Sequence, residues 1–124
     1  HQQQIFIPRI SAPGQWSELK PQSELKKTPL GIFEPISTLI LPTQALDIIL
    51  LPLLSVDQQG YRLGYGGGFY DQLLASLVKK PYLIGLGFHS QLTEKLPHDP
   101  WDIPLDAFLS EQGWLFFSHS QGTI

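Results

Sequence analysis

Residues 47–71 read DIILLPLLSVDQQGYRLGYGGGFYD, which is an apolar run, a polar turn and a glycine cluster in immediate succession. The run over 47–54 is continuously apolar rather than alternating, as is typical of a strand covered on both faces of an α/β sheet. Pro52 would remove a ladder hydrogen bond, so the strand is expected to end or bulge there. This stretch predicts a buried strand that leads through a turn into a glycine-rich loop.

The next segment, DQLLASLVKK over 71–80, predicts a helix. Its apolar residues recur at helical spacing on one face, and these are Leu73, Leu74, Leu77 and Val78. Asp71 near the start and the lysines at 79–80 suit the helix dipole, and Pro81 ends the pattern. YLIGLGF over 82–88 predicts a second buried strand. Strand, glycine loop, helix and strand form a βαβ unit, so we expect an α/β fold with a mostly parallel central sheet flanked by helices in three layers.

The flanking sequence is less regular. Residues 11–29 are rich in Ser, Pro, Gln, Lys and Glu, so they are interpreted as a loop with one helical turn around 17–19. Residues 5–7 and 114–117 are read as short strands, the second at a sheet edge, and 118–124 as a frayed tail. The 124 residues are expected to form a single domain.

Composition excludes several functional classes. The chain has no cysteine, which rules out disulfides and thiolate metal sites. A formal net charge of −3 does not resemble a nucleic-acid footprint, and no apolar run approaches the ~20 residues of a membrane helix. We expect a monomeric cytoplasmic protein that binds neither nucleic acid nor membrane.

The glycine cluster is the strongest functional motif. Gly64, Gly66, Gly67 and Gly68 would let backbone N–H groups approach a phosphate at the start of a helix. Arg62 could grip phosphate oxygens with two bonds, and Asp71 could face a divalent metal. The motif is neither a Walker A loop nor the Rossmann fingerprint. A tight turn without a ligand, with Asp71 as a helix cap, is the alternative interpretation.

RLGYGGGFYD, following a strand that ends in LLPLL, resembles the signature of 5-formyltetrahydrofolate cyclo-ligases. Further matches follow in the same order along the chain. Glu34-Pro35 resembles a Glu-Pro upstream of the strand, and GLGFHSQ resembles the second strand and its glutamine, here Gln91. LPHDPWDIPLDAFLSE resembles the proline- and aspartate-containing loop and closing segment of the family. The resemblance extends from about Ile5 to Glu111.

The resemblance implies the site and the reaction. It implies an ATP site formed by Arg62, Leu63, Gly64, Tyr65, Gly66, Gly67, Gly68, Phe69 and Tyr70. Within it, the segment Tyr65, Gly66, Gly67, Gly68 and Phe69 would also line the folate side, and Asp71 and Asp106 would hold Mg²⁺. The implied reaction transfers the γ-phosphoryl group of ATP to the N5-formyl oxygen of 5-formyltetrahydrofolate. The N10 amine then attacks, and phosphate leaves as the 5,10-methenyl ring closes. Arg62 is the expected stabiliser of transition-state charge.

One departure from the family limits this expectation. Members carry an additional N-terminal portion with basic phosphate contacts and folate contacts, which this sequence does not match. We therefore expect the C-terminal, ATP-binding part of a cyclo-ligase, with weak nucleotide binding and poor turnover by itself. The alternatives are a non-catalytic α/β module that binds a nucleotide or phosphometabolite, and a remnant that binds nothing strongly. Asp99 and Asp102 are interpreted as turn-capping residues, and the four histidines as surface residues.

Overall fold

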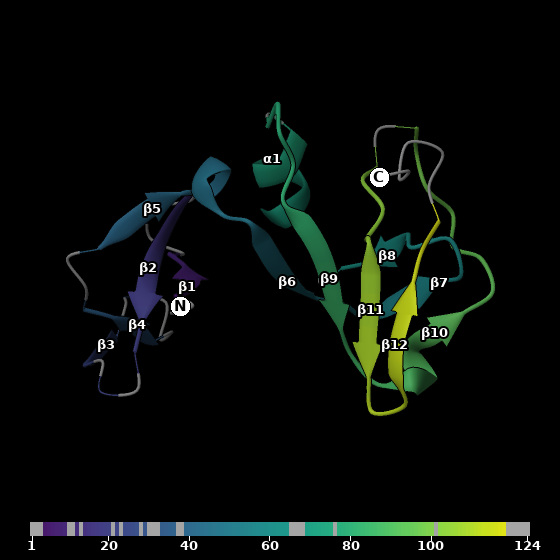
Figure 1. The fold of residues 1–124 in the computed structure, drawn as a ribbon, viewed down its shortest axis with the longest axis horizontal. Coiled ribbons are helices and arrows are strands. Elements are labelled where there is room, and N and C mark those ends of the chain that lie inside the picture. Colours follow the sequence, from purple (N-terminus) through teal and green to yellow (C-terminus); the bar gives the residue numbers. More distant parts are fainter. Residues whose placement is uncertain are drawn as a thin grey trace. The chain divides into compact units, whose positions relative to one another are not determined.

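The computed structural model divides the chain into two compact units, His1–Leu46 and Asp47–Ile124, and each is described by itself. Figure 1 shows the strands of both units and the single labelled helix, α1. The structure describes residues 4–9, 12, 14–20, 22, 24–27, 29, 33–36, 39–64, 69–75, 77–100 and 102–118. The expectation of a single domain over 1–124 stays a prediction.

The first unit is built from short antiparallel strands. Its larger sheet has the order β1-β2-β5, formed by β1 (Ile5–Pro8), β2 (Gln15–Leu19) and β5 (Ile40–Pro42). β3 (Leu25–Lys27) and β4 (Phe33–Pro35) form a separate pair. A 3₁₀ turn, η1 (Thr43–Ala45), follows β5.

The interpretation of 11–29 as a loop with a helical turn is wrong where β2 and β3 lie. Trp16 in β2 is only 4% exposed, and its Nε1 donates to Oγ1 of Thr43 at 2.9 Å. In register, Trp16 faces Pro8 on one side and Leu41 on the other. Pairing with residues distant in the chain therefore fixes this polar segment as a strand, although its local composition favours a loop.

The second unit contains a four-stranded sheet of order β12-β11-β9-β6. β6 (Ile48–Pro52), β9 (Tyr82–Leu86) and β11 (Ala107–Ser110) run parallel, whereas β12 (Gly113–Phe116) is antiparallel to β11 at the edge. A second sheet has the order β10-β7-β8, formed by β10 (Leu92–Thr93), β7 (Ser55–Asp57) and β8 (Arg62–Leu63). α1 (Phe69–Ala75) precedes β9, and the 3₁₀ turn η2 (His89–Gln91) follows it. The structure confirms the predicted helix after Asp71 and three predicted strands, all with shifted ends. These strands were predicted over 47–54, 82–88 and 114–117.

The core of this unit lies on one face of the four-stranded sheet. Ile49 and Leu51 of β6 are 2% and 1% exposed, but Ile48 and Leu50, which alternate with them, are 56% and 53% exposed. The expectation that this strand is covered on both faces is therefore wrong among the described residues. The buried face packs with apolar residues from the rest of the unit, including Leu53, Val56, Leu74, Leu83, Leu105 and Phe108.

The fold is confirmed in its coarser form, an α/β protein with mixed sheets. α1 is the only α-helix in the described part of the chain, so the flanking helices of a three-layer arrangement stay a prediction. Within the described residues, no helix has the length and apolar character needed to cross a membrane.

Candidate functional site

Arg62 and Asp71, predicted to act together, lie in contact. Arg62 belongs to β8, where it pairs with Val56 of β7, and Asp71 lies in the first turn of α1. Nη2 of Arg62 is 3.5 Å from Oδ1 of Asp71. The arginine side chain is 7% exposed and the carboxylate 54% exposed. The pair therefore combines a guanidinium held in place by packing with a carboxylate open to solvent.

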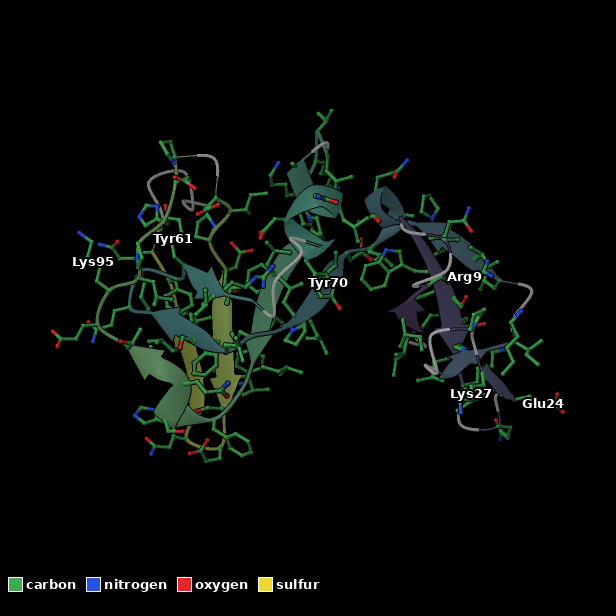
Figure 2. The ribbon with its side chains drawn as sticks, turned by 180° about the vertical axis from the view of Figure 1, so that it is seen from behind. Arg9, Glu24, Lys27, Tyr61, Tyr70 and Lys95 are labelled. Carbon is green, nitrogen blue, oxygen red and sulfur yellow. The ribbon has the colours of Figure 1, made fainter. Side chains whose placement is uncertain are left out.

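Tyr70 is the third member of this group. Its ring centroid is 5.8 Å from Cζ of Arg62, within the range of a cation–π contact. Burial raises the pKa of the Tyr70 phenol above its ordinary value of 10.0, while the positive charge of Arg62 partly offsets this by lowering it. Tyr70 is the second residue of α1 and is labelled in Figure 2. The Tyr70 phenol therefore loses its proton at a higher pH than an exposed tyrosine does.

Gly64 leaves room for the guanidinium. A Cβ atom at this position would lie 2.7 Å from Nη1 of Arg62, closer than real Cβ contacts come. Because the Arg62 side chain is nearly buried, it has little freedom to move aside. The first glycine of the predicted phosphate loop thus has a packing role next to the predicted phosphate-binding arginine.

The hydrogen-bond partners of Asp106 are residues other than Arg62 and Asp71. It directly precedes β11, and its Oδ2 accepts a hydrogen bond from the backbone N–H of Leu83 at 2.8 Å. Its backbone carbonyl accepts from Phe117 N–H at 3.0 Å. Across the described residues, no group of three or more His, Cys, Asp or Glu side chains is gathered to hold a metal ion. The described residues therefore contain no ready-made metal cluster around Asp106 or Asp71.

The other predicted site residues divide into two groups. Leu63 lies in β8, where its carbonyl accepts from Leu54 N–H at 2.7 Å, and Phe69 begins α1. The predicted contacts at Tyr65, Gly66, Gly67 and Gly68 lie outside the described residues. Their assignment to phosphate and folate binding stays a prediction.

Asp57 is a residue that the sequence interpretation left as part of a polar turn. Its side chain is fully buried, and it accepts three backbone hydrogen bonds. Oδ1 accepts from Gln59 at 2.9 Å and Tyr61 at 3.0 Å, and Oδ2 accepts from Leu96 at 3.0 Å. The carboxylate therefore fixes the turn that delivers Arg62 into β8. The sequence pattern that could have identified this turn is an Asp at its first position and a Gly, here Gly60, at its fourth.

Gln91, noted for its resemblance to a family glutamine, connects two segments of the unit. Its Nε2 donates to the carbonyls of Leu53 at 2.9 Å and Leu54 at 3.1 Å, just after β6. Its Oε1 accepts from Phe88 N–H at 2.6 Å, just after β9. The side chain therefore joins the carboxyl ends of two parallel strands.

His98 is in contact with another aromatic side chain rather than isolated. Its ring stacks on Tyr61 with centroids 3.5 Å apart and planes 5° apart. Tyr61 lies well apart from Tyr70 in Figure 2, so this stack is separate from the Arg62 group.

Asp99 and Asp102 hydrogen-bond within their loop, where Oδ2 of Asp102 accepts from Asp99 N–H at 2.8 Å. This contact agrees with the predicted turn-capping role of Asp102.

The donor chemistry of the two predicted metal ligands suits Mg²⁺, which prefers oxygen ligands and keeps several waters. Asp71 offers an exposed carboxylate. Asp106 uses Oδ2 for Leu83, whereas Oδ1 has no hydrogen bond from the described residues. Each carboxylate could hold a hydrated cation through one oxygen without losing its present contact.

The comparisons with known proteins agree on one family. The sequence model of the 5-formyltetrahydrofolate cyclo-ligase family matches residues 1–111. A 5-formyltetrahydrofolate cyclo-ligase of Escherichia coli is 44% identical over 93 residues, covering 73% of this chain and 51% of the relative. One of Haemophilus influenzae is 41% identical over 88 residues, covering 68% of this chain and 47% of the relative. The chain thus spans about half the length of the curated relatives it matches.

Solved structures show the same likeness. The NMR structure of a 5,10-methenyltetrahydrofolate synthetase from Aquifex aeolicus matches 98% of this chain with a TM-score of 0.76 and 28% identity. The match covers 65% of that chain. A 5,10-methenyltetrahydrofolate synthetase from Mycoplasma pneumoniae matches 62% of this chain and 46% of its own, with a TM-score of 0.53 and 35% identity.

Proposed function

The chain belongs to the 5-formyltetrahydrofolate cyclo-ligase family, and we propose that it forms the ATP-binding part of an enzyme that converts 5-formyltetrahydrofolate to 5,10-methenyltetrahydrofolate. ATP is the co-substrate, and ADP and phosphate are released. The observation that carries this proposal is the contact between Arg62 and Asp71, a cation and a carboxylate that stand before and after the predicted phosphate loop in the sequence. A cytoplasmic location and a monomeric state are part of the proposal.

The Arg62 side chain is suited to hold phosphate oxygens. Only its Nη2 has a hydrogen bond among the described residues, and that bond is long at 3.5 Å. The planar guanidinium therefore keeps donors that can bind an incoming phosphate with two parallel bonds. Because packing already fixes the side chain, little conformational entropy is lost when the nucleotide binds. Arg62 would then stabilise the charge that develops on the transferred phosphoryl group.

Asp71 and Asp106 are the residues proposed to hold Mg²⁺. The metal would neutralise phosphate charge. Asp71 would also orient Arg62 through the contact that they already share. The predicted loop residues, Tyr65 through Phe69, would place the formyl group of the folate next to the γ-phosphate. The role of the protein in this proposal is positioning and electrostatic stabilisation rather than covalent chemistry.

Isothermal titration of Mg·ATP into the chain tests this proposal, alongside an absorbance assay for the methenyl product. Arg62→Lys keeps the charge but loses the two-bond geometry, so we expect about a tenfold or greater loss of Mg·ATP affinity. The matched control is Arg9→Lys, since Arg9 is the only other arginine and binds Gln15 in the first unit. Equal affinities for the two variants would contradict the assignment of Arg62.

A non-catalytic nucleotide-binding module is the second candidate. It needs the contact between Arg62 and Asp71 but none of the folate contacts. Mg·ATP binding that depends on Arg62, without methenyl product, would support this candidate over turnover by the 124-residue chain. Product formation by the chain itself would favour the enzyme.

A further inference from the structure

The turn between β7 and β8 is bonded to the segment that carries a second predicted site residue. Gly60 lies in this turn, two residues before Arg62. Its carbonyl accepts a hydrogen bond from the backbone N–H of Leu105 at 2.8 Å, and Asp106 directly follows Leu105. One backbone bond therefore connects the segment of the proposed phosphate-binding cation with the segment of a proposed Mg²⁺ ligand.

Gly60 has a backbone conformation and surroundings that favour glycine. Its φ is +94°, in the left-handed region that side chains rarely adopt. A Cβ atom at this position would lie 2.8 Å from the carbonyl oxygen of Leu105 and 3.1 Å from Cγ and Cδ2 of Phe117. The first distance is shorter than real Cβ contacts come, and it involves backbone. A side chain at position 60 would therefore displace the turn and the Leu105 segment from each other.

Further contacts hold both sides of this junction. The backbone N–H of Phe117 donates to the carbonyl of Asp106 at 3.0 Å, while its ring borders Gly60. Within the turn, Oδ1 of Asp57 accepts from Tyr61 N–H at 3.0 Å, and Asp57 N–H donates to the Tyr61 carbonyl at 2.8 Å. The turn is thus fixed internally and packed against the segment around Asp106.

We propose that Gly60 is a positioning residue for phosphoryl transfer, whose junction with Leu105 sets the place of Arg62 relative to Asp106. The inference rests on the proposed function, in which the guanidinium and the carboxylate engage the same Mg·ATP. Only Tyr61 separates Gly60 from Arg62, and the Arg62 side chain is 7% exposed. A displacement of the turn is therefore passed on to the guanidinium rather than absorbed by a flexible segment. Misplaced positioning groups weaken binding and catalysis even where they do not touch the ligand.

Gly60→Ala tests the inference, and Gly113→Ala is its matched control. Gly113 also has a positive φ, +107°, but a Cβ atom there would meet no atom within 4 Å. It pairs with Ser110 at the end of β11 opposite to Asp106. Both variants therefore carry the strain of an alanine at positive φ, and only Gly60→Ala disturbs the junction. Isothermal titration measures Mg·ATP affinity, and urea denaturation measures the stability of each variant.

We expect Gly60→Ala to bind Mg·ATP about tenfold or more weakly than the parent, and Gly113→Ala to stay within about twofold of it. A merely structural role would lower stability without changing the affinity of the folded chain, so the affinity separates the two roles. The loss should also be non-additive. In an Arg62→Lys or Asp106→Asn background, Gly60→Ala should add less than about twofold, because one of the two aligned groups is already lost.

Phe117→Leu keeps the inference testable if Gly60→Ala does not fold. Leucine replaces the ring that borders Gly60 but keeps the backbone bond to Asp106, and the half-buried position should allow folding. Phe116→Leu is the control, since Phe116 is the neighbouring residue and is 64% exposed. We expect about threefold weaker Mg·ATP binding for Phe117→Leu and parent-like binding for Phe116→Leu.

The outcomes separate this inference from the proposed function. If the parent binds Mg·ATP, equal affinities of Gly60→Ala and Gly113→Ala would overturn the inference alone. Additive losses in either double-variant background would also overturn it. If Gly60→Ala does not fold, equal affinities of Phe117→Leu and Phe116→Leu have the same consequence. A parent chain that does not bind Mg·ATP would instead overturn the proposed function, and this inference with it.

Discussion

Asp106 and Leu83 are joined by two hydrogen bonds, each 2.8 Å long, one through the backbone and one through the side chain. The backbone N–H of Asp106 donates to the carbonyl of Leu83, and the N–H of Leu83 donates to Oδ2 of Asp106. The carboxylate therefore takes part in the start of β11 beside β9. A residue proposed to hold Mg²⁺ thus also has a structural role, and substitutions can separate the two.

Asp106→Asn and Asp106→Ala distinguish these roles. Asparagine keeps an acceptor oxygen for Leu83 but loses the charge, so we expect stability within about 1 kcal/mol of the parent and a reduced thermal shift with Mg·ATP. Alanine leaves the Leu83 N–H without this acceptor. In addition to the reduced thermal shift, it should therefore lower the free energy of unfolding by roughly 1–3 kcal/mol. Urea denaturation and thermal unfolding with and without Mg·ATP measure both effects. Asp102→Asn in the same loop is the control, and an equal loss of the Mg·ATP shift there would argue against Asp106 as a ligand.

Asp57→Asn should be strongly destabilising although it is nearly isosteric. Both oxygens of Asp57 accept backbone N–H groups, so the amide NH₂ of asparagine must face at least one donor. We expect a loss on the order of 2–3 kcal/mol in the free energy of unfolding, measured by urea denaturation. Asp47→Asn, at an exposed position, should change stability by less than about 0.5 kcal/mol. Similar values for the two variants would show that the charge of Asp57 has no structural role.

Glu111 provides an acid-dependent contribution to stability. The backbone N–H of His89 donates to its Oε1 at 2.8 Å, and this bond, more than any other effect, lowers the pKa of the Glu111 carboxyl. Because the folded-state pKa lies below the unfolded one, the contribution is present above the unfolded pKa and is lost as pH falls through the folded pKa. When thermal unfolding is measured against pH, the melting temperature of the parent should therefore lie above that of Glu111→Gln at neutral pH. The two curves should converge in acid, and a constant difference would contradict this assignment.

The ionisation of Tyr70 should respond to Arg62. Burial raises the pKa of this phenol and the arginine charge opposes the increase, so Arg62→Gln should raise the pKa further. Tyrosinate absorbance gives the titration, and Tyr70→Phe identifies the contribution of this residue. The folded-state pKa of Tyr70 is raised, so the protonated phenol contributes to stability at pH values below the ordinary, unfolded-state pKa. This contribution is lost as pH rises through the folded-state pKa. An unchanged or lowered pKa in Arg62→Gln would mean that the two side chains are not in contact in solution.

The sequence predicted the main elements of the second unit because their patterns are local. The apolar run before Pro52 and the helical spacing after Asp71 both produced elements close to those observed. β2 was missed because its formation depends on pairing with β1 and β5 rather than on its own composition. The one-sided burial of β6 was also missed, since a continuous apolar run has the same appearance whether one face or two are covered.

The sequence grouped Arg62 and Asp71 because they stand on either side of one motif, and the structure shows them in contact, whereas their roles stay predictions. The role of Asp57 depends on a bond to Leu96, 39 residues further along the chain, and no local pattern encodes that contact. The dual bonding of Asp106 to Leu83 is likewise a property of the neighbouring strand rather than of the aspartate loop.

The exposed apolar side chains on the second face of the four-stranded sheet, such as Ile48 and Leu50, have a calorimetric consequence. The heat-capacity increase on unfolding arises from apolar surface that becomes hydrated, and side chains such as Leu50 and Phe116 are already largely hydrated in the folded chain. The increment for this chain should therefore fall below the usual ~12–15 cal/mol/K per residue.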